Sequence, residues 1–101
     1  MVKQRRAKDG RSWAQAKMGL SYLDGDNGFP VDKTEAFKWF ELAAEQRHPF
    51  ALHHLAEIYY EGLGDIVEQS YSKVRVMMKE AADLGYILAQ VKLFRMYCKG
   101  E

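Results

Sequence analysis

Three short stretches of the chain carry one pattern: an alanine, an apolar residue four positions later, and a tyrosine four positions after that. The copies are Ala14, Met18 and Tyr22; Ala51, Leu55 and Tyr59; and Ala89, Leu93 and Tyr97. The first alanine thus moves from position 14 to 51 and then to 89, in steps of 37 and 38 residues. A period of this length indicates a solenoid of stacked helical units. Because such solenoids act mainly through extended surfaces, function is to be sought on their faces.

The repeat contains two kinds of segment, and the apolar residues of both have helical spacing. Steps of three and four residues place the apolar side chains of the three copies, the A segments, on one stripe of a helix. The alanine-rich stretches between them, the B segments, carry stripes of their own: Ala36, Phe37, Phe40, Ala43 and Ala44, and then Val74, Met77, Met78, Ala81 and Ala82. We predict an all-α fold of five helices, near residues 12–24, 33–46, 49–61, 70–83 and 86–99, without strands.

Start signals agree with these stripes. Ser12 with Gln15, and Asp32 with Glu35, have the spacing of a capping box, in which two helix N–H groups are satisfied reciprocally. Pro49 suits the first turn of the third helix, where its missing N–H costs nothing. The sequence therefore predicts capped starts at residues 12 and 32.

Composition limits the class of protein. With 48% hydrophobic residues and a formal charge of +1, the chain can bury a core and has no global field for nucleic acid or membranes. A single cysteine, Cys98, rules out an internal disulfide and suits a reducing compartment. There is no apolar run of about 18 residues, and no apolar stretch behind the basic N-terminus to form a signal peptide. We favour a cytoplasmic location, with the alternative that the chain is a piece of a larger protein whose targeting segment lies elsewhere.

The charge is concentrated at one end. Residues 1–11 contain five basic residues and one acidic residue. We describe them as a basic N-terminal arm, which is either a frayed, solvated terminus, a contact for an acidic partner or part of a longer basic element.

The pattern resembles the Sel-1-like repeat, a relative of the tetratricopeptide repeat. The first copy carries Ala14, Met18, Gly19, Tyr22, Gly25, Val31, Asp32, Glu35, Ala36, Phe37, Lys38, Trp39, Phe40, Ala43 and Ala44; the second carries Ala51, Leu55, Ala56, Tyr59, Gly62, Gly64, Ala81, Ala82 and Gly85; the third carries Ala89, Leu93, Tyr97 and Gly100. The resemblance implies a right-handed α-α superhelix of antiparallel hairpins. It divides the chain into the arm at 1–11, repeat 1 at 12–50, repeat 2 at 51–88 and a terminal A helix at 89–101.

The chain departs from the family pattern at three positions. Val74 and Met77 replace the alanine and tryptophan of the second B segment, and Phe94 stands where glycine or alanine is expected. Small residues at the corresponding positions, Gly19 and Ala56, predict close approach between helices. The residues expected to hold the repeats together are Gly19, Tyr22, Trp39, Ala56, Tyr59 and Tyr97.

The resemblance implies a non-enzymatic protein-interaction module, an adaptor or scaffold, without cofactor or metal. If the A helices line the concave face, as in tetratricopeptide relatives, a peptide or partner helix would bind there. The predicted groove residues are Trp13, Leu20, Phe50, His53, Glu57, Tyr60, Val91 and Arg95.

Other functions stay open at this point. His53 and Glu57 share a helical face and could belong to a metal-binding or enzymatic site, although zinc needs three or four ligands. The basic arm together with Trp13 could contact nucleic acid. The last helix has apolar residues on more than one side, which is compatible with a homo-oligomer or with a fragment of a longer solenoid.

Overall fold

The computed structural model describes the backbone of residues 2–101 and the side chains of residues 11–101 except residue 27. Five α-helices and one short 3-10 helix follow one another: α1 (Val2–Asp24), η1 (Asp26–Gly28), α2 (Lys33–Glu45), α3 (Pro49–Glu61), α4 (Tyr71–Asp83) and α5 (Ile87–Lys99). Among residues 2–101 there is no strand, and one isolated bridge joins Leu63 to Val67. The predicted all-α chain of five helices is confirmed.

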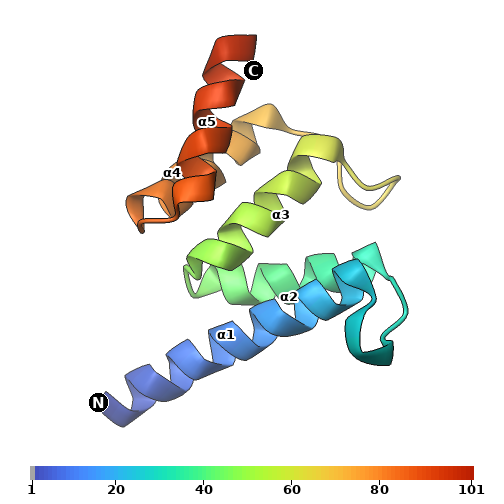
Figure 1. Ribbon diagram of the computed structural model, residues 1–101, viewed down its shortest axis with the longest axis vertical. Helices are drawn as coiled ribbons and strands as arrows, with labels where there is room; N and C mark the ends of the chain where they lie inside the picture. Colours follow the sequence, from blue (N-terminus) through green and yellow to red (C-terminus); the bar gives the residue numbers. More distant parts are fainter. Residues whose placement is uncertain (1) are drawn as a thin grey trace.

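Each helix packs against the next one along the chain. In Figure 1, α1 and α2 lie alongside each other at one end of the molecule, α4 and α5 lie at the other end, and α3 runs between them. The two termini are far apart, as expected when helix pairs are added in one direction.

The predicted start of the first helix is wrong. Helix α1 begins at Val2, so Ser12 lies in its interior, where it is buried, and it does not cap a helix. The residues before Ser12 are mostly lysine, arginine, glutamine and alanine, which favour helix. The first turns of α1 extend beyond the end of α2 in Figure 1. The side chains of residues 1–10, and with them most of the predicted basic arm, lie outside the described residues.

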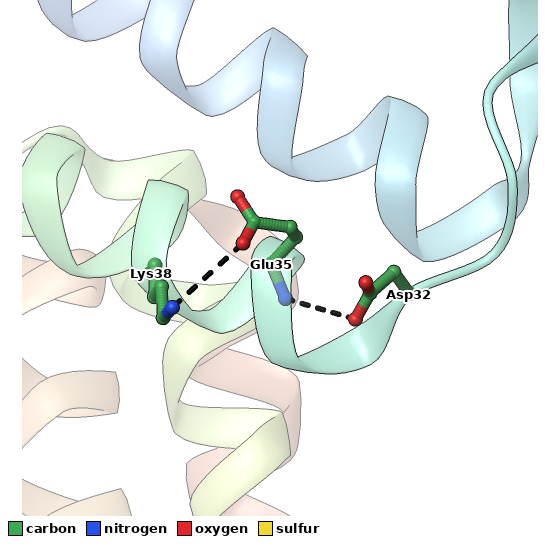
Figure 2. A network of polar contacts seen from close by, with 3 residues as sticks. All are labelled: Asp32, Glu35 and Lys38. Carbon is green, nitrogen blue, oxygen red and sulfur yellow. Dashed lines mark hydrogen bonds and ion pairs between the residues drawn. The ribbon is translucent and has the colours of Figure 1, made fainter.

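The predicted cap at Asp32 is present, but only half of the capping box forms. Asp32 Oδ1 accepts a hydrogen bond from the Glu35 backbone N–H at 3.2 Å. The Glu35 carboxylate points along the helix to Lys38, with 3.7 Å between Oε2 and Nζ, as Figure 2 shows. The Asp32 N–H donates instead to the Tyr22 carbonyl at 2.8 Å, which ties the start of α2 to the end of α1.

The other helix bounds agree with the sequence within one residue. Pro49 occupies the first turn of α3 as predicted. Helix α4 begins one residue later than predicted because Ser70 is its N-cap, whose hydroxyl accepts from the Lys73 N–H at 3.3 Å. Differences of this size are ordinary at helix ends.

The core consists of two clusters, one shared by α1, α2 and α3 and the other by α3, α4 and α5. The first contains Ala16, Ala36, Phe40, Ala43, Ala51 and Leu55. The second contains Leu52, Ala56, Val74, Met78, Ala81, Ala89 and Met96. Ala44, Tyr59 and Met77 pack against both clusters, so the apolar interior is continuous from one repeat to the next.

Small residues permit close helix packing where the sequence predicted it. A Cβ placed on Gly19 would lie 2.8 Å from Phe40 Cε1, so only glycine fits against this buried ring. The matching residue in α3, Ala56, is completely buried. The matching residue in α5, Phe94, is 68% exposed. Helix α5 therefore presents a bulky apolar residue at the position where α1 and α3 receive their hairpin partners.

Candidate functional site: the face formed by α1, α3 and α5

A hollow lies between α3 and α5, with a volume of about 330 Å³. Its lining residues are His53, Glu57, Leu88, Val91, Lys92 and Arg95. Four of these residues, two from each helix, belong to the predicted groove: His53, Glu57, Val91 and Arg95. Helices α3 and α5 occupy equivalent places in successive repeats, so this hollow lies between two A helices.

A second, smaller hollow of about 150 Å³ lies on the other side of α3. It is lined by His54, Glu57 and Ile58 of α3, and by residues that include Leu23 of α1 and Lys33 of α2. Glu57 borders both hollows, so α3 forms a ridge between them with this carboxylate on its crest. The exposed face of α3 is thus accessible from both sides.

His53 is the most buried of the predicted groove residues, with 7% of its surface exposed. Its Nε2 lies 3.5 Å from Glu57 Oε1, and its buried Nδ1 has no hydrogen-bond partner among the described residues. Burial lowers the pKa of His53, and the nearby Lys92 charge lowers it further, although Glu57 acts in the opposite direction. The neutral form of the imidazole is therefore favoured at pH 7.

His54 lies beside His53 but faces the core. Its ring stacks on Phe40, with centroids 5.3 Å apart and an interplanar angle of 14°, and lies 4.5 Å from the Phe50 ring. Burial lowers its pKa, and the charge of a protonated His53 would lower it further. His54 is therefore a neutral aromatic contact between the hairpin core and the ridge.

Trp13 and Phe50, two of the predicted groove residues, meet at the start of α3. Their ring centroids are 6.4 Å apart, and both contact His48, whose ring stacks on Trp13 at 5.6 Å. Phe50 also lies 6.3 Å from the Tyr86 ring, at the turn before α5. Burial lowers the pKa of His48. The rings form a continuous aromatic row from α1 to the start of α5.

Tyr60, another predicted groove residue, is engaged with the end of the chain. Its hydroxyl donates to Glu101 Oε1 at 2.7 Å, which raises the pKa of Tyr60 to about 12. Lys92 Nζ lies over its ring, 3.5 Å from the centroid, and the Tyr71 ring is 5.3 Å away. Tyr60 thus positions Lys92 at the hollow without lining the hollow itself.

Of the other residues predicted for the groove or for packing between repeats, some pack against neighbouring side chains and one is largely exposed. Leu20 packs against the first core cluster and is only partly exposed. Tyr22 contacts Phe29 with centroids 5.0 Å apart, and Tyr59 contacts Phe37 at 5.8 Å. Tyr97 is 70% exposed. Trp39 is partly buried within α2.

Four residues of this face were missed by the sequence analysis: Leu88 and Lys92 in the hollow, and His48 and Tyr86 in the aromatic row. The sequence did carry a signal for Leu88 and Lys92, because both lie on the same helical stripe as Val91 and Arg95. His48 and Tyr86 immediately precede helices and have no periodic signal.

The described part of the chain contains no cluster of three histidine, cysteine, aspartate or glutamate side chains that could hold an ion. The His53 and Glu57 pair therefore stands without a third ligand from these residues. In the same part of the chain, no helix combines the length and apolar character of a membrane span.

Residues 14–48 and 49–86 each match the Sel1 repeat. This chain belongs to the Sel1 repeat family. The predicted family and the solenoid fold are confirmed, and the two repeats follow each other directly along the chain. Sel1 repeats are typically protein-interaction modules and are generally scaffolding rather than enzymatic.

Solved structures with Sel1 repeats have the same fold. A protective antigen of uropathogenic Escherichia coli displaying an SLR fold is 36% identical with a TM-score of 0.80, over 96% of this chain and 20% of that one. A Sel1 repeat protein from Oxalobacter formigenes is 32% identical with a TM-score of 0.79, over 93% of this chain and 37% of that one.

Two curated relatives are much longer proteins. The chitin synthase regulator SKT5 of Saccharomyces cerevisiae is 31% identical over 94 residues, which are 87% of this chain and 14% of that protein. The ERAD-associated E3 ubiquitin-protein ligase component HRD3A of Arabidopsis thaliana is 38% identical over 58 residues, which are 57% of this chain and 9% of that protein. The chain thus spans a small part of each.

Proposed function

We propose that this chain is an adaptor or scaffold that binds a peptide or partner helix along the face formed by α1, α3 and α5. The observation that carries the proposal is that His53, Glu57, Val91 and Arg95 line one hollow although the two pairs belong to different repeats. Exposed apolar and charged side chains beside a partly buried aromatic row are the composition of a binding surface. Leu88 and Val91 offer apolar contact, while Glu57 and Arg95 set the register of the ligand.

The names of the curated relatives support the same role. One is a regulator of an enzyme and the other is a component of a ubiquitin ligase. Both descriptions suit a module that holds another protein and does no chemistry itself. We place this module in the cytoplasm, a proposal supported by its single cysteine.

Selection from a phage-displayed library of random peptides tests the groove. Panning is done against the wild-type chain and against Val91→Asp, which introduces a charge into the hollow at a half-exposed position. Val76→Asp on α4 is the matched control, because Val76 is also exposed and lies away from the hollow. We expect peptides that bind wild type and Val76→Asp but lose at least about tenfold in affinity for Val91→Asp. Selected peptides that bind all three proteins equally would overturn the groove assignment.

The proposal includes self-association through α5. Ile87, Phe94 and Tyr97 are each about 70% exposed on this helix, and apolar residues so exposed favour a protein contact. A second copy of the chain would cover them. Light scattering over a range of concentrations should then show a mass above 11.7 kDa that falls toward this value in Phe94→Ser. A concentration-independent monomer would contradict this part of the proposal.

A further inference from the structure

The charges that line the hollow between α3 and α5 are unequal. Lys92 and Arg95, both from α5, stand opposite one carboxylate, Glu57 of α3. Glu57 Oε1 is already 3.5 Å from His53 Nε2 and 4.0 Å from His54 Nδ1, on the crest of the ridge. The side of the hollow formed by α5 therefore carries the excess positive charge.

The two cations differ in what holds them. The Lys92 ammonium lies over the Tyr60 ring, so its position is fixed by an aromatic contact. The Arg95 guanidinium makes no ion pair or hydrogen bond to the described side chains. A guanidinium with all its donors available binds a carboxylate through two parallel hydrogen bonds.

Apolar surface lies directly beside these cations. Leu88 and Val91 occupy the same stripe of α5 and are 57% and 43% exposed. A ligand that covers them must itself have apolar side chains, which a free anion or a nucleic-acid backbone lacks. The combination of a fixed ammonium, an unpaired guanidinium and two exposed aliphatic side chains calls for a ligand that is both acidic and apolar.

We propose that the hollow between α3 and α5 selects peptides in which an acidic side chain adjoins apolar ones. The acidic group binds Arg95 with Lys92 beside it, and the apolar side chains cover Leu88 and Val91. The aromatic row at Trp13 and Phe50 continues the surface toward α1. This inference rests on the proposed function, since it names the class of peptide that the same groove accepts.

The test uses the peptides from the display selection that depend on Val91. Their content of aspartate and glutamate, compared with the starting library, reports the charge preference of the hollow. We expect acidic residues to be enriched, and a selection against Arg95→Glu to enrich lysine and arginine instead. Arg75→Glu makes the same change of charge on α4, which does not line the hollow, so this control should select the same acidic peptides as wild type. Val91-dependent peptides that are neutral or basic would overturn the acidic preference while leaving the groove in place.

Affinity measurements separate the remaining outcomes. Fluorescence anisotropy with one selected acidic peptide should show binding that weakens as salt rises and that is about tenfold weaker for Arg95→Glu than for Arg75→Glu. The alternative result is a single-stranded oligonucleotide that displaces the peptide from wild type but does not bind Arg95→Glu. That result would show that the site binds phosphates, and it would overturn the peptide proposal. If no selected peptide depends on Val91, the proposed function fails and this inference fails with it.

Discussion

The ring of Phe40 lies so close to Gly19 that a Cβ on this glycine would come within 2.8 Å of Cε1. Phe40 of α2 is completely buried in the cluster that α2 forms with α1 and α3, so its ring has little room to move away from Gly19. The pair fixes the separation of the first two helices and illustrates how a small residue in one helix receives a large one from its neighbour.

Gly19→Ala is therefore expected to destabilise the chain. Alanine gains about 0.5–1 kcal/mol over glycine inside a helix, but overpacking a core costs about 1–3 kcal/mol. The free energy of unfolding, measured by urea denaturation, should fall by about 1 kcal/mol. Adding Phe40→Leu should make the glycine substitution less costly, because the two changes share one contact. A Gly19→Ala protein more stable than wild type would show that the ring moves aside.

Asp32→Ala should weaken the start of α2. The carboxylate caps the Glu35 N–H (Figure 2), and loss of an N-cap costs about 0.5–2 kcal/mol. Lys38→Ala, which removes the exposed pair with Glu35, should cost less than about 1 kcal/mol. Urea denaturation of both variants distinguishes the two contributions. A larger loss in Lys38→Ala than in Asp32→Ala would mean that the ion pair contributes more than the cap to this turn.

Stability should fall as the pH is lowered through the range where free histidine protonates. Burial lowers the pKa of His48, His53 and His54 below 6.5 in the folded chain. The unfolded chain therefore binds protons first, so stability is fully present above about pH 6.5 and is lost as the pH falls toward the folded pKa values. The urea midpoint should decrease between about pH 7.5 and pH 5.5.

Histidine variants give the control for this pH dependence. His53→Gln keeps a polar side chain that does not titrate, so its urea midpoint should change less with pH than that of wild type. NMR titration of the ring protons should place the folded pKa of His53 below 6.5. A midpoint that is flat over this range would contradict the burial of these rings.

The hydrogen bond between Tyr60 and Glu101 should be visible in the titration of the phenol. The Glu101 carboxylate accepts a hydrogen bond from the Tyr60 hydroxyl. This hydrogen bond stabilises the protonated phenol and raises the pKa of Tyr60 to about 12. Glu101→Gln should lower this pKa toward the usual 10, measured by NMR of the ring carbons. Glu61→Gln, a nearby change on α3, is the control and should leave it unchanged. A high pKa that survives in Glu101→Gln would point to another cause.

The fold could be predicted from the sequence because α2, α3, α4, α5 and the second half of α1 each carry a periodic apolar stripe. Pro49, Asp32 and the glycines that end helices place four of the helices within one residue of their observed bounds. The start of α1 could not be predicted in the same way, since Ser12 and Gln15 match a capping box although the residues before them favour helix. A cap signal has meaning only where the chain before it is not helical.

The candidate site was predicted in part. His53, Glu57, Val91 and Arg95 follow from helical stripes and from the assumption that equivalent helices face the same way. His48 and Tyr86 join the aromatic row because two interhelical turns bring them to it, and such convergence depends on crossing angles that a single sequence does not specify. Tyr60 shares the stripe but contacts Glu101, a residue beyond the last helix.

Ala44, Tyr59 and Met77 each pack against both core clusters. Neither hairpin can lose its structure without exposing side chains that the other needs, so the two repeats should unfold in a single cooperative transition. A destabilising change deep in the first hairpin, such as one at Ala43, would then remove the proposed binding site between α3 and α5 without touching that surface. The module should accordingly function as one indivisible unit, present as a whole or absent as a whole.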